Sequence, residues 1–511
     1  MCTIINHDNY LYVDTLTLKS IIIDKSMSSK MIDMFLSKQY PSLTHLDCRN
    51  TKITNIPELQ TLTSLNCGGC TELTIIPLLS RLITLDCNNC IGIKNIPNFP
   101  SLKDLDCSRC DNLTSIPLLS NLDYLNCGEC RNLTSIPELP SLTSLHCGGC
   151  TELTSIPLLS RLTTLDCNKC IGIKNIPYLQ GLTELDCSWC DNITSIPLLS
   201  SLNYLNCSEC RKITGIPLLY RLTTLYCRNC TGIKNIPYFA SLNELDCSRC
   251  DNLTSIPELQ TLTSLWCGGC KELTSIPELP GLITLYCWSC TKLEHIPILP
   301  SLITLKCWFC KMLTNIPPLP NLSILDCNTC TGIENIPYLP RLTELHCGWC
   351  TELTSIPLLS TLTSLNCCNS GNLTSIPELP SLTRLSCSYC ISITSIPILS
   401  RLTLLDCSGC AKLTSIPELP LLTNICCLYC TNLDSIPILP RLSMLSCGRC
   451  DKLTSIPKLP RLTTLYCSSS LSQDSINNLP NLENLNSRLF IRENTINTKL
   501  PKSTISDCVI C

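Results

Sequence analysis

The sequence predicts a solenoid of short parallel β-strands, and three observations support this fold class. Leucine recurs at every twentieth position from Leu62 to Leu482, which makes 22 copies without a linker, preceded by a slightly shorter copy at Leu43. Within each copy the segment around Leu-x-Cys alternates between inward and outward positions, as a strand does. The other half, Ile-Pro-x-Leu, should be extended or polyproline-like, because proline fixes φ and removes a backbone donor.

The first residues of the chain form a degenerate copy of the same repeat. Residues 10–25 carry apolar residues at the repeat spacing, namely Val13, Leu16, Leu18, Ile21 and Ile23. Ser29 can cap a short helix that ends before Pro41 and whose apolar side consists of Met31, Ile32, Phe35 and Leu36. We therefore expect residues 1–40 to form an N-terminal cap, residues 41–487 the repeat solenoid, and residues 488–511 a C-terminal tail.

Composition disfavours several classes of partner. The 37 basic and 40 acidic residues leave a net charge of −3, so the chain lacks the positive field of a nucleic-acid-binding protein. The N-terminus has no basic segment followed by an apolar core and a cleavage site, and no apolar run approaches about 18 residues. We expect no secretory signal, no integral membrane segment and a cytoplasmic location, where the 46 cysteines stay reduced.

The complete repeat pattern is L-x-x-L-x-C-x-x-C-x-x-L-x-x-I-P-x-L, as in residues 261–280, TLTSLWCGGCKELTSIPELP. It resembles the leucine-rich repeat, whose consensus is L-x-x-L-x-L followed by x-x-N-x-L or x-x-C-x-x-L. Both endings occur, because the copy at Leu43 has the shorter spacing with Thr51 at the Asn position. The chain looks most like the shortest class of this family, known from bacterial effectors and from amoebal and giant-virus proteins. Cysteine in place of the second strand leucine departs from the family and makes the core smaller.

This resemblance implies a leucine-rich-repeat solenoid shaped as a horseshoe or arc. Its parallel β-sheet would line the concave face, its convex side would be extended, and helix would be confined to the region near the N-terminus. We expect a non-enzymatic scaffold that binds a protein partner on the concave face, in the host cytosol if the protein is viral. A substrate-recognition adaptor of a ubiquitin ligase is an alternative, although residues 1–40 contain no recognisable F-box.

The repeats carry Cys-x-x-Cys 19 times, with Ser370 breaking the series. A zinc site needs four thiolates that converge on one ion, usually from two distant pairs. Here the pairs would lie on parallel strands in register, with the first cysteine in the core and the second in the turn that follows. We therefore interpret the cysteines as small buried hydrophobes that form a ladder. Metal or redox binding by the cysteine arrays is the alternative function of another class.

Catalysis has little support in the sequence. None of the five histidines has a nucleophile and an acid at a recognisable motif spacing, and no phosphate-binding G-x-x-x-x-G-K-[ST] is present. His146 and His346 fall on outward strand positions, where contact with solvent or a ligand is expected. Since only the tail 488–511 follows the last repeat, we expect no separate ligase domain. We also expect no enzymatic activity and no cofactor.

Outward strand positions should carry any specificity. Four of the five tryptophans fall between residues 266 and 349, on or beside the predicted concave face. Exposed aromatic clusters mark interaction surfaces, although drift among duplicated copies is an alternative. The candidate partner-binding residues are Tyr226, Trp266, Tyr286, Trp288, Trp308, Phe309, His346 and Trp349. Aspartates in the Trp266 column could form a weak calcium surface or a solvated acidic face.

The C-terminal tail ends in Cys-Val-Ile-Cys. This resembles a C-a-a-X prenylation box, in which Cys508 would be lipidated and the chain would associate peripherally with a membrane. Terminal cysteine is not a usual last residue of such a box, and basic residues upstream are sparse. A disordered end is the alternative.

Overall fold

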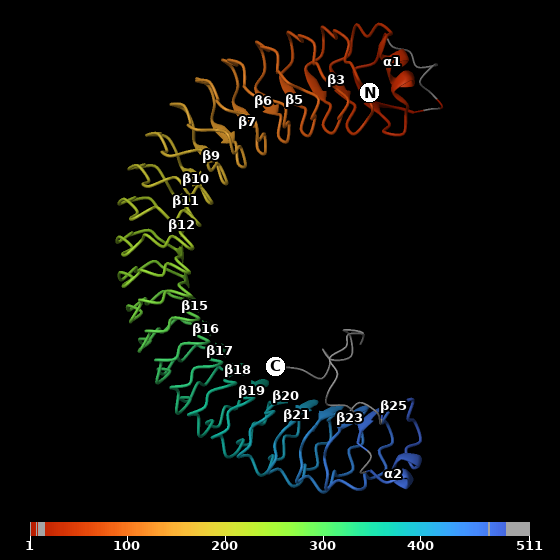
Figure 1. Cartoon of the computed structure of the whole chain (residues 1–511), viewed down its shortest axis with the longest axis vertical. Helices are drawn as coiled ribbons and strands as arrows, with labels where there is room; N and C mark the ends of the chain where they lie inside the picture. Colours follow the sequence, from red (N-terminus) through yellow and green to blue (C-terminus); the bar gives the residue numbers. More distant parts are fainter. Residues whose placement is uncertain (1, 7, 9–15, 469–470, 487–511) are drawn as a thin grey trace, which may run out of the picture. The chain divides into compact units, whose positions relative to one another are not determined.

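A computed structural model describes residues 2–6, 8, 16–468 and 471–486 and shows a parallel β-solenoid whose turns follow the sequence repeat (Figure 1). The chain divides into two compact units, Met1–Cys250 and Asp251–Cys511. The solenoid with little helix that the sequence predicts is confirmed. In the part of the chain that the structure describes, no helix is long and apolar enough to cross a membrane.

The first unit holds strands β1 to β13, each parallel to its neighbour, and the helix α1, Ser29–Leu36. From β4 onward each residue pairs with the one at the same repeat position in the next turn, as Leu65 pairs with Leu85. The strands are β1 Cys2–Ile5, β2 Ser20–Ile23, β3 His45–Asp47, β4 Ser64–Asn66, β5 Thr84–Asp86, β6 Asp104–Asp106, β7 Tyr124–Asn126, β8 Ser144–His146, β9 Thr164–Asp166, β10 Glu184–Asp186, β11 Tyr204–Asn206, β12 Thr224–Tyr226 and β13 Glu244–Asp246.

The N-terminal elements agree with the expected strand and helix and add one strand. β2 and α1 lie where the apolar spacing predicts them, and Ile32, Phe35 and Leu36 on α1 are buried. The N-cap of α1 is Ser28 rather than Ser29, and its side chain makes no capping hydrogen bond. β1 pairs with β2 in parallel and was not expected, because its four residues show no repeat spacing. Val13 lies outside the described residues.

The second unit holds strands β14 to β25 and the short helix α2, Gln473–Asn477. Its strands are again parallel and pair residues at equal repeat positions. They are β14 Ser264–Trp266, β15 Thr284–Tyr286, β16 Thr304–Lys306, β17 Ile324–Asp326, β18 Glu344–His346, β19 Ser364–Asn366, β20 Arg384–Ser386, β21 Leu404–Asp406, β22 Asn424–Cys426, β23 Met444–Cys447, β24 Thr464–Cys467 and β25 Asn484–Asn486.

Each turn buries the side chains that the repeat spacing assigns to the core. In the turn that contains β14, the inward residues are at most 4% exposed, namely Leu262, Leu265, Cys267, Cys270, Leu273, Ile276 and Leu279. The proline halves carry no helix, and isolated parallel bridges such as Ser115 to Ser135 join some of them across turns. Because both halves of a turn pack only on the turns beside it, the core is a continuous column along each unit.

In turn after turn the second cysteine of the pair donates a hydrogen bond to the turn before it, as two examples show. The Cys90 thiol donates to the carbonyl of Cys67 at 3.0 Å, and Cys330 donates to the carbonyl of Cys307 at 3.0 Å. Ser370 makes the same bond, with its hydroxyl 3.0 Å from the carbonyl of Cys347. These thiols therefore satisfy backbone acceptors. Within the described chain, no three His, Cys, Asp or Glu side chains are grouped so as to hold a metal ion.

Two further columns of side chains make hydrogen bonds to the backbone at the two ends of the strands. A threonine column precedes the strands, and in it the Thr163 hydroxyl donates to the carbonyl of Thr143 at 3.0 Å. An Asx column ends the strands, and in it Asp106 accepts from the backbone N–H of Ser108 at 2.9 Å. The aspartates of the proposed acidic or calcium face thus cap the strand ends, a role that the sequence interpretation missed.

The stacked thiols predict how serine substitutions should affect stability. Cys330→Ser should change the free energy of unfolding by less than about 1 kcal/mol, because Ser370 already shows that a hydroxyl can make this bond. Cys327→Ser should cost about 1–3 kcal/mol, because the fully buried first cysteine packs in the apolar core, where a hydroxyl is costly to desolvate. Urea unfolding under reducing conditions measures both, and equal losses would contradict the assigned roles.

Burial of the first-cysteine thiols predicts loss of stability at alkaline pH. Burial raises the pKa of Cys347 and of Cys447 well above the ordinary value of about 8.5. Since the unfolded thiols ionise near that value and the folded ones do not, their contribution is fully present below about pH 8.5 and is lost as the pH rises above it. Each such thiol lowers the free energy of unfolding by about 1.4 kcal/mol per pH unit.

Urea midpoints between about pH 7 and pH 9.5 test this dependence. Cys347→Ala, which removes one of these thiols, should reduce the slope above about pH 8.5. A flat profile across this range would show that the buried thiols do not control alkaline stability.

Candidate functional site

Three adjacent strands of the second unit bring predicted binding residues together at their ends. Trp266 on β14 pairs in register with Tyr286 on β15, and Tyr286 pairs with Lys306 on β16. The rings of Trp266 and Tyr286 are stacked, with centroids 6.1 Å apart and planes 20° apart. The Lys306 ammonium lies 5.2 Å from the Tyr286 ring centroid, within the range of a cation–π contact.

A second stacked pair follows the first cysteine in two of these turns. Trp288 and Trp308 stack with centroids 5.1 Å apart and planes 9° apart. Trp308 is 38% exposed, and Trp288 is half-buried because its ring lies over Gly268, where a Cβ would collide with the indole. Glycine at position 268 is therefore what allows this ring to lie down against the preceding turn.

Phe309 and Trp349 occupy the turn position before the second cysteine, where φ is positive. Their φ values are 64° and 61°, a left-handed conformation that costs a non-glycine residue about 1–2 kcal/mol. Glycine fills the same position at Gly69, Gly149, Gly269 and Gly409. The Phe309 side chain is 36% exposed and has the Lys311 ammonium 4.8 Å from its centroid. Large aromatic side chains therefore stand out from a strained turn.

We name the aromatic cluster as Trp266, Tyr286, Trp288, Trp308 and Phe309, with Lys306 among them. The other predicted site residues lie elsewhere. His346 is on β18, with Nε2 4.0 Å from the Glu344 carboxylate. Trp349 follows β18 and is 55% exposed, two turns further along the chain than Phe309. Both lie at the same kind of strand end, but among the described residues the stacked ring pairs are those of the cluster, Trp266 with Tyr286 and Trp288 with Trp308.

Tyr226 belongs to the first unit and has partners of its own. Its hydroxyl donates to Glu244 at 2.8 Å, and its ring meets Tyr204 edge-on with centroids 5.8 Å apart. Burial and the hydrogen bond with Glu244 raise the pKa of Tyr226 to about 12. The structure therefore places Tyr226 in a local contact across β11 to β13 rather than in the aromatic cluster.

Two exposed apolar residues near the cluster were not predicted from the sequence. Ile283 and Ile303 precede β15 and β16 and are 42% and 44% exposed. They line a shallow hollow of about 530 Å³, together with Ser301, Asn321, Ser323 and Arg341. The sequence contained a signal for them, because isoleucine replaces the threonine whose hydroxyl donates to the previous turn in other copies.

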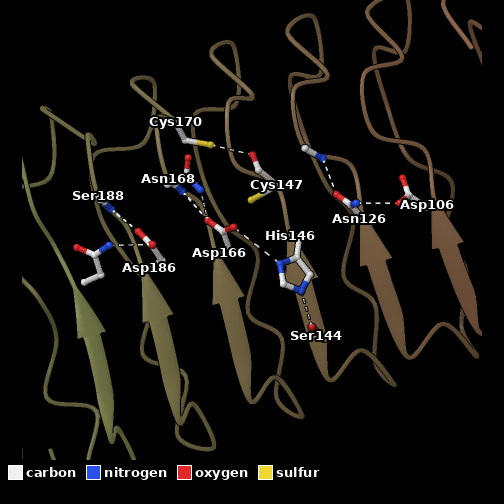
Figure 2. Close-up of polar contacts among 12 residues, drawn as sticks. Asp106, Asn126, Ser144, His146, Cys147, Asp166, Asn168, Cys170, Asp186 and Ser188 are labelled. Carbon is white, nitrogen blue, oxygen red and sulfur yellow. Dashed lines mark hydrogen bonds and ion pairs between the residues drawn. The ribbon is translucent and has the colours of Figure 1, made fainter. Parts of the chain in front are cut away.

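A polar cluster occupies the corresponding strand ends of the first unit (Figure 2). The Ser144 hydroxyl lies 3.1 Å from His146 Nε2, and His146 Nδ1 lies 3.8 Å from Asp166 Oδ2. The Tyr124 ring lies against the imidazole, with centroids 5.4 Å apart. Burial alone would raise the pKa of Asp166, but the interaction with the His146 imidazole and the hydrogen bonds from Asn168 lower it below its ordinary value.

The Ser144, His146 and Asp166 order resembles that of a nucleophile, base and acid. The sequence interpretation missed it, because the serine and histidine are two residues apart and the aspartate is on the next strand. The Ser144 N–H donates to the carbonyl of Asp123 and the Cys147 N–H to the carbonyl of Asp166, so these amides are engaged between turns. They cannot serve as donors to an oxyanion at Ser144, which is what an acyl-transfer site needs.

Comparison with family models, curated proteins and solved structures finds no match to this chain. The structure by itself establishes a parallel β-solenoid whose strands stack in register, one strand for each sequence repeat. Cys508 and the expected prenylation box lie outside the described residues.

The left-handed backbone conformation at Trp349 predicts how its replacement by glycine affects stability. Trp349→Gly should leave the free energy of unfolding unchanged or raise it by up to about 1 kcal/mol, because relief of the positive φ offsets the greater entropy of unfolded glycine. Trp308→Gly should destabilise by about 1–3 kcal/mol, because Trp308 stacks on Trp288. Thermal unfolding compares the two variants, and a larger loss for Trp349→Gly would contradict this assignment.

Proposed function

We propose that the chain is a non-enzymatic protein-binding scaffold of the leucine-rich-repeat kind and that its aromatic cluster contacts the partner. The repeat assignment is supported by the short stacked turns, the buried leucine positions and the second cysteine, which donates between turns where the family has Asn or Cys. The binding assignment is supported by the position of the cluster at the ends of three adjacent strands.

The observation that carries the proposal is that two adjacent turns depart from the repeat in several columns at once. The turn of β15 has Ile283, Tyr286 and Trp288 where most other copies have a polar residue, an Asx residue and a small or polar residue. The turn of β16 has Ile303, Lys306 and Trp308 in the corresponding places, and Phe309 at the position that follows. Drift in a single column would not concentrate apolar residues in two neighbouring turns.

These departures also remove stabilising groups. Isoleucine has no hydroxyl to donate to the previous turn, and the Tyr286 and Lys306 side chains cannot form the short Asx turn that Asp106 forms. Each missing hydrogen bond is worth about 0.5–1.5 kcal/mol. These turns therefore have fewer internal hydrogen bonds and more exposed apolar surface than the other copies. Such a loss of stability in favour of an exposed apolar surface is expected of a binding site.

The charges of the cluster indicate the chemistry of the partner. Lys306 lies over Tyr286 and Lys311 over Phe309, and among the described residues neither ammonium forms an ion pair. Stacked indoles and exposed isoleucines beside them would cover an apolar segment. We infer a protein partner whose contact segment combines apolar side chains with carboxylates, because carboxylates would pair with the two lysines.

Affinity capture with the full chain tests the site. The double variant Trp288→Ala and Trp308→Ala should lose its specific partner, with affinity reduced by at least about 100-fold, because central tryptophans dominate interface energies. The measurement is quantitative mass spectrometry of captured proteins, followed by titration of the partner.

Trp189→Ala provides the matched control. Trp189 is 51% exposed on a left-handed turn of the first unit, so the control removes an exposed indole outside the cluster. Proteins retained by wild type and control but lost by the double variant are partners of the cluster. An unchanged set of partners would remove the proposed site.

A further inference from the structure

A row of apolar side chains projects from the proline side of the first unit, away from the strand ends. In five consecutive turns the residue after proline is apolar and exposed, at 62%, 56%, 54%, 39% and 53%. We name this row the apolar stripe, and it consists of Leu158, Tyr178, Leu198, Leu218 and Tyr238. The next-but-one residue after Leu218, Tyr220, is 68% exposed and widens it.

The core does not require apolar residues at this position. The isoleucine before the proline and the leucine after the stripe residue are the buried members of this segment, as Ile196 and Leu199 show. Glutamate occupies the stripe position in several other turns, for example at Glu138, Glu258 and Glu278, and is exposed there. The apolar residues of the stripe are therefore surplus to the packing of the solenoid.

The turns stack in register, so the stripe forms a line rather than scattered points. Neighbouring strands in these turns pair residues at equal repeat positions, as Leu185 pairs with Leu205 and Leu205 with Leu225. At a strand spacing of about 4.8 Å, five turns place the stripe residues along about 20 Å. The side chains project singly from a proline-containing ridge, and together they offer a narrow apolar edge.

The charged side chains beside the stripe within its own five turns are basic, whereas Glu138 and Glu258 occupy the same repeat position in the turns before and after it. Within four positions on either side of each stripe residue, the charged side chains are Arg161, Lys174, Arg221 and Lys234, and the sequence has no acidic residue there. All four basic side chains are exposed. The chain as a whole has a net charge of −3, so this basic surround is a local feature.

We propose that the apolar stripe is a docking edge for an anionic lipid bilayer surface. Exposed leucine and tyrosine side chains enter the boundary between headgroups and acyl chains, and flanking lysine and arginine side chains attract anionic headgroups. Charge complementarity favours this occupant over a second copy of the chain, because two such basic edges would repel each other. A narrow edge of separately projecting side chains also suits a fluid surface.

The second unit carries a matched row that lacks the basic surround. Ile298, Tyr338 and Leu358 are 62%, 61% and 58% exposed at the same repeat position, with Pro318 between the first two. The carboxylates and guanidinium within four positions of this row belong to Glu294, Glu334 and Arg341. Its surround is therefore acidic on balance, so this row serves as an internal control for the effect of apolar exposure alone.

Vesicle co-sedimentation of the full, unlipidated chain tests the proposal. The wild type should bind phosphatidylcholine vesicles that contain about one third phosphatidylserine, and binding should fall with added salt. Leu198→Glu with Leu218→Glu should reduce the partition coefficient at least tenfold, and Lys174→Glu should reduce it by about fivefold or more. Glutamate is already accommodated at the stripe position, so both leucine substitutions should fold, which circular dichroism checks.

Ile298→Glu with Leu358→Glu is the control and should leave vesicle binding unchanged. Trp288→Ala with Trp308→Ala should bind vesicles like the wild type, which separates this proposal from that of the aromatic cluster. The proposal is overturned if the wild type does not bind the anionic vesicles, or if it binds pure phosphatidylcholine equally well. It is also overturned if the stripe variant binds as the wild type does, or if that variant instead loses a dimer or a protein partner while vesicle binding persists.

Discussion

In-register stacking of short turns is the constraint on which the rest of the structure depends. A turn of this length has no room for a long helix, and α2 in the turn after β24 has only five residues, so the backbone and side-chain donors of a turn are satisfied mainly by the neighbouring turns. The second cysteine and the threonine before the strand each make one of these bonds, and the Asx residue at the end of the strand accepts from a backbone N–H of its own turn. The residue type at each of these positions is therefore constrained by its hydrogen bond. The Cys-x-x-Cys sequence, which resembles a metal-binding motif, is part of this internal hydrogen bonding.

Residues that differ from the rest of their column are informative about function, because the column shows which side chain the stacking favours at that position. A tryptophan or isoleucine on an irregular surface would carry little information, but Ile283, Trp288 and Trp308 stand where the repeat expects a hydrogen-bonding or small side chain. Gly268 makes room for one of these indoles. The apolar stripe follows the same logic on the other side of the turn, where glutamate and leucine are both compatible with the core. Functional side chains in this fold are therefore expected at positions where the stacking of the turns does not depend on the residue type.

Prediction from sequence succeeded where the period determined the answer and failed where two turns had to be compared. The inward leucines and cysteines, the register and α1 followed from spacing alone. The strand β1 did not, because Cys2–Ile5 has no repeat spacing and is held by pairing with β2. The alignment of Ser144, His146 and Asp166 was also missed, since a distance across strands is set by the stack. Tyr226 stays a predicted binding residue, and its contacts with Tyr204 and Glu244 set it apart from the stacked rings of the aromatic cluster.

The sequence by itself determined the solenoid, its period and which side chains fill the core, because a strict repeat leaves one packing solution for every turn. Tertiary structure decided what the polar and aromatic columns do. It turned the aspartates into strand-end caps, the second cysteines into donors to the preceding turn, and Trp266, Tyr286, Trp288 and Trp308 into stacked pairs. The physical reason is that the cysteine and aromatic roles depend on atoms about a repeat away in the sequence, which only the stacking of one turn on the next brings within contact distance. The aspartate caps depend instead on the path of the backbone in the turn that follows the strand.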